Sequence, residues 1–142
     1  MEQPLVERRD ARGVVTLTMN RPRSFNALSE EMLDALQAAM QRLGPDEWVR
    51  AVVLAAEGKA FCAGHDLKQM IAQPELAYYQ ALFARCSRVM LAIRALPVPV
   101  IARVQGIATA AGCQLVAQCD LAVASTEARF AVSGINFGLF CS

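Results

Sequence analysis

The stretch VQGIATAAGCQLVAQCD at residues 104–120 decides how the rest of the sequence can fold. Its first sixteen residues carry no charge, and small residues crowd together between Gly106 and Gly112. Apolar residues with helical spacing follow, and Leu115 and Cys119 fall on one face. The pattern predicts a buried strand, a tight turn and a helix whose first turn has almost no side chains.

A helix that begins in this way has two possible uses. Its first backbone N–H groups have no partner within the helix and lie at the positive end of the helix dipole. An atom that develops negative charge can therefore approach them closely. Alternatively, the small residues only allow the helix and the sheet to pack tightly. The spacing alone leaves both interpretations open.

Strand-like and helix-like segments alternate along the whole chain. Val14–Met19 predicts a strand, with Val6 and its neighbours as the partner in a hairpin, and Ser29 caps a helix that ends at Gly44. The remaining expected elements are an apolar strand at 50–56, a loop at 57–64, a short helix at 66–70, a long helix from 74 to 96, strands at 98–104, 121–124 and 128–131, and a loop at 132–142. Helices that cross between apolar strands predict an α/β domain with a largely parallel sheet.

Two junctions between a strand and a helix carry small residues, at 60–67 and at 106–115. The carboxyl ends of neighbouring parallel strands lie on the same edge of a sheet. The two junctions are therefore expected to come together, so that one N–H group from each converges on a single oxygen atom.

Composition excludes several classes of partner. The chain has 142 residues, 55% of them hydrophobic, and a net charge of +1, which fits one domain with a substantial core. So small a charge gives no electrostatic reason to expect nucleic acid or an anionic membrane surface as a partner. The uncharged run at 104–119 is too short, and too rich in Gln and Gly, to span a membrane.

The five cysteines and the single histidine do not form a metal-binding pattern. We expect no metal site and reduced, mostly buried cysteines. The chain begins with the charged segment MEQPLVERRDARG, where a secretory leader would be apolar. These observations favour a cytoplasmic location.

Several common catalytic motifs are missing from the sequence. The glycines between 106 and 112 lack the dinucleotide-binding spacing, and no phosphate-binding loop with Gly-Lys-Ser or Gly-Lys-Thr occurs. No serine lies in a nucleophile-elbow pattern. The two junctions remain the strongest candidates for chemistry.

Four segments match the crotonase (enoyl-CoA hydratase/isomerase) superfamily in order and spacing. They are NRPRSFNALS at 20–29, AFCAGHDLKQM at 60–70, PVPVIARVQGIATAAGCQLVAQCDLAVAS at 97–125 and RFAVSGINFGL at 129–139. The chain is most similar to the enoyl-CoA hydratase domain-containing subgroup, which lacks the catalytic glutamates. The resemblance implies an α/β fold, a spiral of ββα units, as one domain over residues 1–142.

The resemblance also implies which residues form the site. The substrate is an acyl-CoA thioester with no other bound cofactor, and the backbone N–H groups of His65 and Ala111 form an oxyanion hole. The residues implied in substrate binding are Arg23, Phe25, Ala60, Ala63, Gly64, His65, Asp66, Leu67, Thr109 and Ala111. Arg23 either approaches the CoA phosphates or is a solvated loop residue. Asp66 is interpreted as a helix cap in preference to a base.

The sequence departs from the family at the two catalytic glutamates, whose positions are taken by Gln114 and Gly134. An amide exchanges no proton at neutral pH and glycine has no side chain, although Gln114 can still hydrogen-bond a water or a carbonyl. Acid–base groups contribute roughly 10²–10⁴-fold to rate. Hydration is therefore expected to be weak while enolate stabilisation survives, with the His65 imidazole as an alternative base.

Family members continue beyond this length, with helices that close the acyl pocket and build trimers or hexamers. The chain is accordingly interpreted as an N-terminal portion that stops before those helices, at Ser142. Two functions are considered. One is a lyase or isomerase of acyl-CoA substrates in fatty acid metabolism. The other is a catalytically weak acyl-CoA-binding or regulatory protein.

Overall fold

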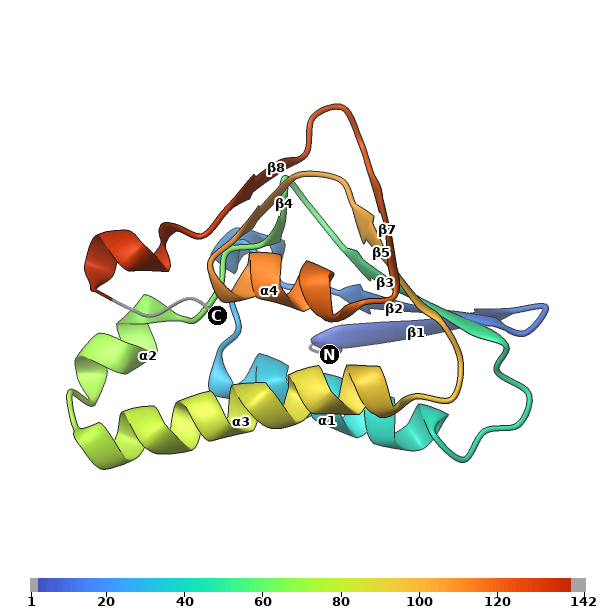
Figure 1. Ribbon diagram of the computed structural model, residues 1–142, viewed down its shortest axis with the longest axis horizontal. Helices are drawn as coiled ribbons and strands as arrows, with labels where there is room; N and C mark the ends of the chain where they lie inside the picture. The colour runs from blue at the N-terminus through green and yellow to red at the C-terminus, as the bar shows by residue number, and fades with distance from the viewer. Residues whose placement is uncertain (1–2, 139–142) are drawn as a thin grey trace.

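A computed structural model describes residues 3–138 as two sheets with helices around them (Figure 1). The larger sheet has the strand order β1-β2-β3-β5-β7, formed by Val6–Ala11, Val14–Met19, Ala51–Ala56, Val100–Val104 and Leu121–Ala124. β1 and β2 form the expected hairpin, and the other neighbouring strands pair in parallel. The predicted α/β class is confirmed.

The smaller sheet holds three short strands that are all parallel. They are β4 (Ala60–Cys62), β6 (Ile107–Thr109) and β8 (Arg129–Ala131). Successive strands enter the two sheets alternately, since β3, β5 and β7 join the larger sheet and β4, β6 and β8 the smaller. A helix follows each of these strand pairs, so the expected spiral of ββα units is confirmed.

Six helical segments accompany the sheets, and their bounds follow from local signals. They are η1 (Pro22–Ser24), α1 (Glu30–Leu43), α2 (Leu67–Ala72), α3 (Leu76–Ala95), α4 (Ala111–Gln118) and η2 (Ser133–Phe137) within the described residues. The Ser29 hydroxyl accepts from the N–H of Met32 at 3.2 Å, which confirms the predicted cap of α1. α1 and α3 lie side by side, and α4 lies between α3 and the smaller sheet (Figure 1).

Three sequence-based expectations are wrong in detail. The segment 57–64 is not only a loop, because it contains β4, and 106–110 is not only a turn, because it contains β6. Strands of three residues are too short to show a hydrophobic period. The loop expected at 132–142 contains the 3₁₀-helix η2, whereas residues 139–142 lie outside the described range.

Two glycines of the 104–120 stretch allow the close packing that was one of its two interpretations. A side chain at Gly106 would collide with the carbonyl of Lys59, and one at Gly112 would collide with the carbonyl of Cys62. Both contacts press β6 and α4 against β4. Close packing therefore explains these glycines.

The third ββα unit is less covered than the first two. Every residue of β7 and β8 is exposed, with Leu121 at 62% and Val123 at 63%. The strands β3 and β5, by contrast, hold buried residues such as Leu54 and Val100. Within residues 3–138, no helix combines the length and the apolar character needed to cross a membrane.

Candidate active site

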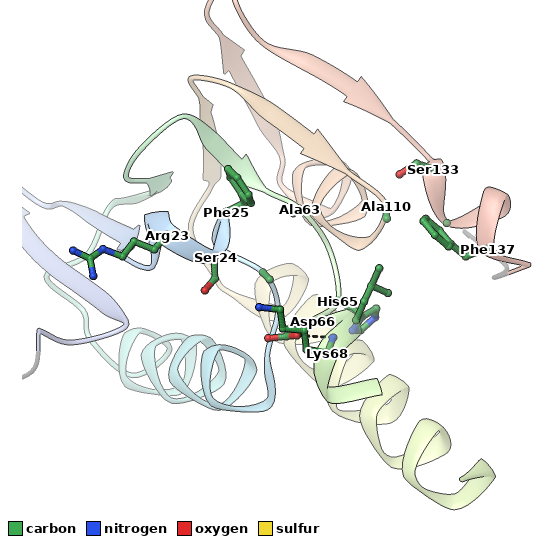
Figure 2. Close-up of a pocket in the computed structure, with 13 residues that line it drawn as sticks. Arg23, Ser24, Phe25, Ala63, His65, Asp66, Lys68, Ala110, Ser133 and Phe137 are labelled. Atoms are coloured by element: carbon green, nitrogen blue, oxygen red, sulfur yellow. Dashed lines mark hydrogen bonds between the residues drawn. The ribbon is translucent and has the colours of Figure 1, made fainter. Parts of the chain in front are cut away.

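The three strands of the smaller sheet end at one cavity of about 360 Å³. Its lining residues are Arg23, Ser24, Phe25, Ala27, Ala63, His65, Asp66, Leu67, Lys68, Ala110, Ser133, Gly134 and Phe137. Figure 2 shows Arg23 and Phe25 at one end of this group and Ser133 and Phe137 at the other. Ligands of parallel sheets commonly bind at the carboxyl ends of the strands, so the place of the cavity fits a substrate site.

The peptide group between Gly64 and His65 is oriented by a segment that precedes α1. The N–H of Leu28 donates to the Gly64 carbonyl at 2.7 Å, and the N–H of Ala63 donates to the Phe25 carbonyl at 3.0 Å. In a trans peptide the N–H points opposite to the C=O. The His65 N–H therefore points away from Leu28, and it makes no hydrogen bond to another described residue.

The N–H of Ala111 is freed by the start of a helix. α4 begins at Ala111, and the carbonyl of Ala110 accepts from the N–H groups of Cys113 at 3.0 Å and Gln114 at 3.1 Å. The N–H of the same Ala110–Ala111 peptide therefore points out of the helix end, where the helix dipole is positive. Among the described residues it too has no acceptor.

Gly64 brings the two junctions into contact. Its φ is +91°, and a side chain there would lie 3.0 Å from the Cβ of Ala110, 3.1 Å from the carbonyl of Thr109 and 3.2 Å from the amide nitrogen of Ala111. The parallel pairing of β4 with β6 aligns the strands that lead to both junctions. The structure thus places the two junctions against each other, as the strand pattern predicts.

The His65 side chain is held in an apolar environment beside the cavity. Its ring packs edge-on against Phe83 with a centroid distance of 5.1 Å and an interplanar angle of 78°. Burial lowers the pKa of the imidazole below its usual value, and its buried Nδ1 has no hydrogen-bond partner among residues 3–138. The ring is therefore neutral at pH 7.

The charged residues of the site have different roles: Asp66 caps a helix, and Arg23 and Lys68 line the cavity. Asp66 Oδ1 accepts from the N–H groups of Lys68 at 2.9 Å and Gln69 at 3.3 Å, which fits its interpretation as the cap of α2. Arg23 belongs to η1, and its guanidinium points away from His65 in Figure 2. Arg23 and Lys68 add two positively charged side chains to the lining of a largely apolar cavity.

The structure gathers most, but not all, of the predicted site residues. Those that line the cavity are Arg23, Phe25, Ala63, His65, Asp66, Leu67 and Gly134. Gly64, Thr109 and Ala111 lie at the contact of the two junctions. Ala60 lies outside the lining, buried in β4, and Gln114 is half-buried in the first turn of α4, also outside it.

Six lining residues were not predicted: Ser24, Ala27, Lys68, Ala110, Ser133 and Phe137. Ser133 and Phe137 belong to η2, which was expected to be a loop, and Ser133 Oγ lies 2.5 Å from Thr109 Oγ1. Lys68 lies within the quoted motif AFCAGHDLKQM. The other five also lie within the four quoted motifs, so the motif match was the signal that could have found all six.

Comparison with known proteins identifies the family to which the chain is related. A family profile described as enoyl-CoA hydratase/isomerase matches residues 9–142. Enoyl-CoA hydratase domain-containing protein 3, mitochondrial, from Xenopus laevis is 45% identical over 139 residues, which cover 98% of this chain and 47% of that protein. The Homo sapiens protein of the same name is 45% identical over 130 residues, covering 92% of this chain and 43% of its own length.

Solved structures agree with the sequence comparison. The crystal structure of an enoyl-CoA hydratase from Mycobacterium smegmatis has a TM-score of 0.96 and 72% identity, covering 99% of this chain and 55% of that one. That of human enoyl-CoA hydratase domain-containing protein 3 has a TM-score of 0.90 and 44% identity, with the same coverage of 99% and 55%. The chain thus spans about half the length of these relatives.

One sequence-based expectation is overturned by these relatives. The cytoplasmic location is wrong, because the frog and human proteins are named as mitochondrial. The cysteine argument failed for a physical reason, since reduced thiols distinguish reducing from oxidising compartments but not one reducing compartment from another.

The fold and the comparisons lead to the same assignment. The spiral of ββα units, which the motifs implied, matches the crystal structures over nearly the whole chain. The profile match covers far more than half of the sequence. The chain therefore belongs to the enoyl-CoA hydratase/isomerase family, the crotonase superfamily that its motifs resemble.

Proposed function

We propose that this chain binds an acyl-CoA thioester and stabilises its enolate with the backbone N–H groups of His65 and Ala111. The observation that supports the proposal is the contact of the two junctions at Gly64, where neither N–H has another acceptor among the described residues. An oxyanion needs two free donors directed at one oxygen, and two unpartnered N–H groups on touching junctions can supply them.

The chemistry follows from where charge develops. When a proton leaves the carbon next to the thioester carbonyl, negative charge moves onto the carbonyl oxygen. Each of the two N–H donors strengthens its hydrogen bond to that oxygen as the charge grows. A donor of this kind contributes roughly 10²–10³-fold to rate. The end of α4 adds the positive potential of its dipole to the Ala111 donor.

The proposed substrate also has a place for its CoA portion. Phe25 and Leu67 are exposed apolar side chains of the cavity, and Arg23 and Lys68 supply positive charge. We assign the pantetheine chain to the apolar part and the CoA phosphates to the neighbourhood of Arg23 and Lys68. Coenzyme A enters here as part of the substrate, and no resident cofactor is proposed.

The proton-transfer step is proposed to be weak. At the positions that the resemblance assigns to glutamates, Gln114 offers an amide and Gly134 offers no side chain. The carboxylate of Asp66 is engaged as the cap of α2. The second candidate function, an acyl-CoA-binding protein with little turnover, is favoured by the same observation.

A hydration assay with crotonyl-CoA distinguishes the two candidates. We expect slow turnover from the natural sequence and a faster rate from a variant that combines Gln114→Glu with Gly134→Glu, by roughly 10²-fold or more. Turnover of the natural sequence at ordinary enzyme rates would contradict the weak-catalyst proposal. Binding of crotonyl-CoA, measured by calorimetry in the same samples, tests the acyl-CoA site separately from its chemistry.

The family resemblance also suggests a trimer or a hexamer. Sedimentation velocity on the purified chain would measure its oligomeric state. A monomer across the micromolar range would contradict this part of the proposal and leave the acyl-CoA site untouched.

A further inference from the structure

We propose that Asn26 is a positioning residue that aims the His65 N–H at the thioester oxygen. This inference rests on the proposed oxyanion role of His65. Asn26 precedes His65 in the sequence by about forty residues, and it does not line the cavity. Its side chain nevertheless controls the segment that orients the Gly64–His65 peptide.

The Asn26 side chain is completely buried, with 0% of its surface exposed, and every polar atom has a partner. Its Oδ1 accepts from the N–H of Arg21 at 2.8 Å. Its Nδ2 donates to the carbonyls of Glu57 at 2.8 Å and Ala60 at 3.0 Å. The bond from Arg21 lies within the segment between β2 and α1, and the two Nδ2 bonds fasten that segment to the connection after β3 and to the first residue of β4.

The backbone on either side of Asn26 makes the contacts that matter for the site. The Phe25 carbonyl accepts from the N–H of Ala63 at 3.0 Å, and the Leu28 N–H donates to Gly64 at 2.7 Å. Leu28 and His65 form a parallel bridge. Movement of the segment 25–28 would therefore rotate the Gly64 carbonyl, and with it the His65 N–H on the same rigid peptide plane.

The position favours asparagine for two physical reasons. Its φ is +51°, a left-handed conformation that asparagine tolerates better than most residues with a side chain. The site also requires one acceptor and two donors in a planar group, which is the inventory of a carboxamide. Glycine at this position would suit the backbone but would lose all three hydrogen bonds. Aspartate would place a carboxylate oxygen, which can only accept, opposite the two carbonyls to which Asn26 Nδ2 donates.

Gln105 provides a matched control, because its side chain also donates to carbonyls of the chain from β3 to the start of β4. Gln105 Nε2 donates to the carbonyls of Gly58 at 2.9 Å, in the connection between β3 and β4, and of Ala60 at 3.2 Å, at the start of β4. Gln105 is not hydrogen-bonded to the segment 25–28 within the described structure. Gln105→Ala therefore loosens the connection without releasing the segment that orients Gly64.

The experiment is difference infrared spectroscopy of crotonyl-CoA labelled with carbon-13 at the thioester carbonyl. Two good donors polarise the carbonyl, so its stretch should move to lower frequency on binding to the natural sequence. In Asn26→Gly we expect at least half of that shift to be lost, and in Gln105→Ala we expect it to be retained. Turnover of Asn26→Gly should fall roughly 10- to 100-fold, with KM changed by less than about threefold, because the donor acts mainly in the transition state.

Each outcome separates the two proposals. Absence of a shift in the natural sequence contradicts the oxyanion function itself. A shift that Asn26→Gly retains in full overturns the positioning role of Asn26 alone. Equal loss in Gln105→Ala also overturns it, because the effect then belongs to the whole connection. If the glycine variant unfolds, Asn26→Asp takes its place, because it keeps the bond to Arg21 and the positive φ. A carbonyl shift between that of the natural sequence and no shift supports the positioning role, and a full shift overturns it.

Discussion

The two proposed donor amides are held in place by different means. The His65 N–H is oriented across the fold, by Leu28 and Phe25 from a segment nearly forty residues earlier. The Ala111 N–H is oriented locally, by the start of α4 and by Ala110, whose φ is +53°. The difference teaches that one donor depends on tertiary packing and the other on the helix that it begins.

The largest effect is expected from removing the local donor. Ala111→Pro deletes one N–H at the first position of α4, where helices tolerate proline best. We expect turnover of crotonyl-CoA, or binding of an enolate analogue, to fall roughly 10²–10³-fold. Steady-state kinetics and circular dichroism would measure activity and folding in the same samples.

The control for that variant is Cys113→Ala, in the same helical turn. It keeps every N–H group and changes only a half-exposed side chain, so we expect activity within about twofold of the natural sequence. A folded Ala111→Pro variant with unchanged activity would show that Ala111 is not a donor.

The next largest effect is expected where the two junctions meet. Gly64→Ala places a methyl group 3.0 Å from the Ala110 Cβ and 3.2 Å from the Ala111 nitrogen, at a φ of +91°. Strain and overpacking together should lower the free energy of unfolding by roughly 2–4 kcal/mol. Urea unfolding would measure the loss.

Gly138→Ala is the matched control for the strain that an alanine experiences at a positive φ, separated from overpacking. Gly138 also has a positive φ, +72°, but a side chain there meets nothing within 4 Å in the described part of the chain. We expect a loss of only about 1 kcal/mol. Equal losses in the two variants would mean that the junctions are not pressed together at Gly64.

A smaller effect is expected at the His65 side chain, since the proposed donor is its backbone. His65→Gln keeps the N–H and removes the imidazole, so binding of crotonyl-CoA should change by less than about threefold. Calorimetry would measure this affinity. A fall in turnover of roughly 10²–10⁴-fold, with binding intact, would instead identify the imidazole as the alternative base.

The same variant tests the pH dependence of stability. Burial lowers the pKa of His65 in the folded chain, so below about pH 6.5 the unfolded chain binds more protons than the folded one. The stabilising contribution of the neutral ring is therefore complete above that pH and is lost as pH falls towards the lower folded pKa. The slope cannot exceed about 1.4 kcal/mol per pH unit for one group.

Urea unfolding of the natural sequence and of His65→Gln between pH 7 and pH 5 would measure that slope as a difference. The subtraction removes the contribution of carboxylates, which both proteins share. Parallel curves for the two proteins would contradict the lowered pKa.

The smallest effect concerns the strained residue at the local junction. Ala110→Gly relieves a φ of +53° and should raise the free energy of unfolding by about 1 kcal/mol. Ala117→Gly makes the same chemical change at an exposed position in the last turn of α4 and should lower it by up to about 1 kcal/mol. Thermal unfolding of both variants would show whether the signs differ as expected.

Much of the fold is readable from the sequence because long elements carry a period. The strand at Val14–Met19 and the helix after Ser29 were predicted with nearly correct ends, since alternation and capping are local signals. β4 and β6 were missed because three residues show no period. Their existence depends on pairing with each other, which is not encoded in either segment alone.

The site was predictable to a similar degree and for similar reasons. The small residues before α2 and α4 are a local signal, and parallel pairing brings the two junctions together. Of η2, the motif match pointed only to Gly134, and Ser133 was missed because it reaches the site only through the path of β8. Nor was the role of Asn26, whose partners Glu57 and Ala60 are more than thirty residues away.

Because both proposed donors are main-chain atoms, the site has an unusual tolerance of mutation. At Ala111, only proline among the natural amino acids removes the N–H, so side-chain replacement at that position leaves the donor in place. The residues that transfer protons have no such protection, since their chemistry resides in the side chain. A sequence built in this way can lose or exchange its acid–base groups by single substitutions while its two-amide site persists.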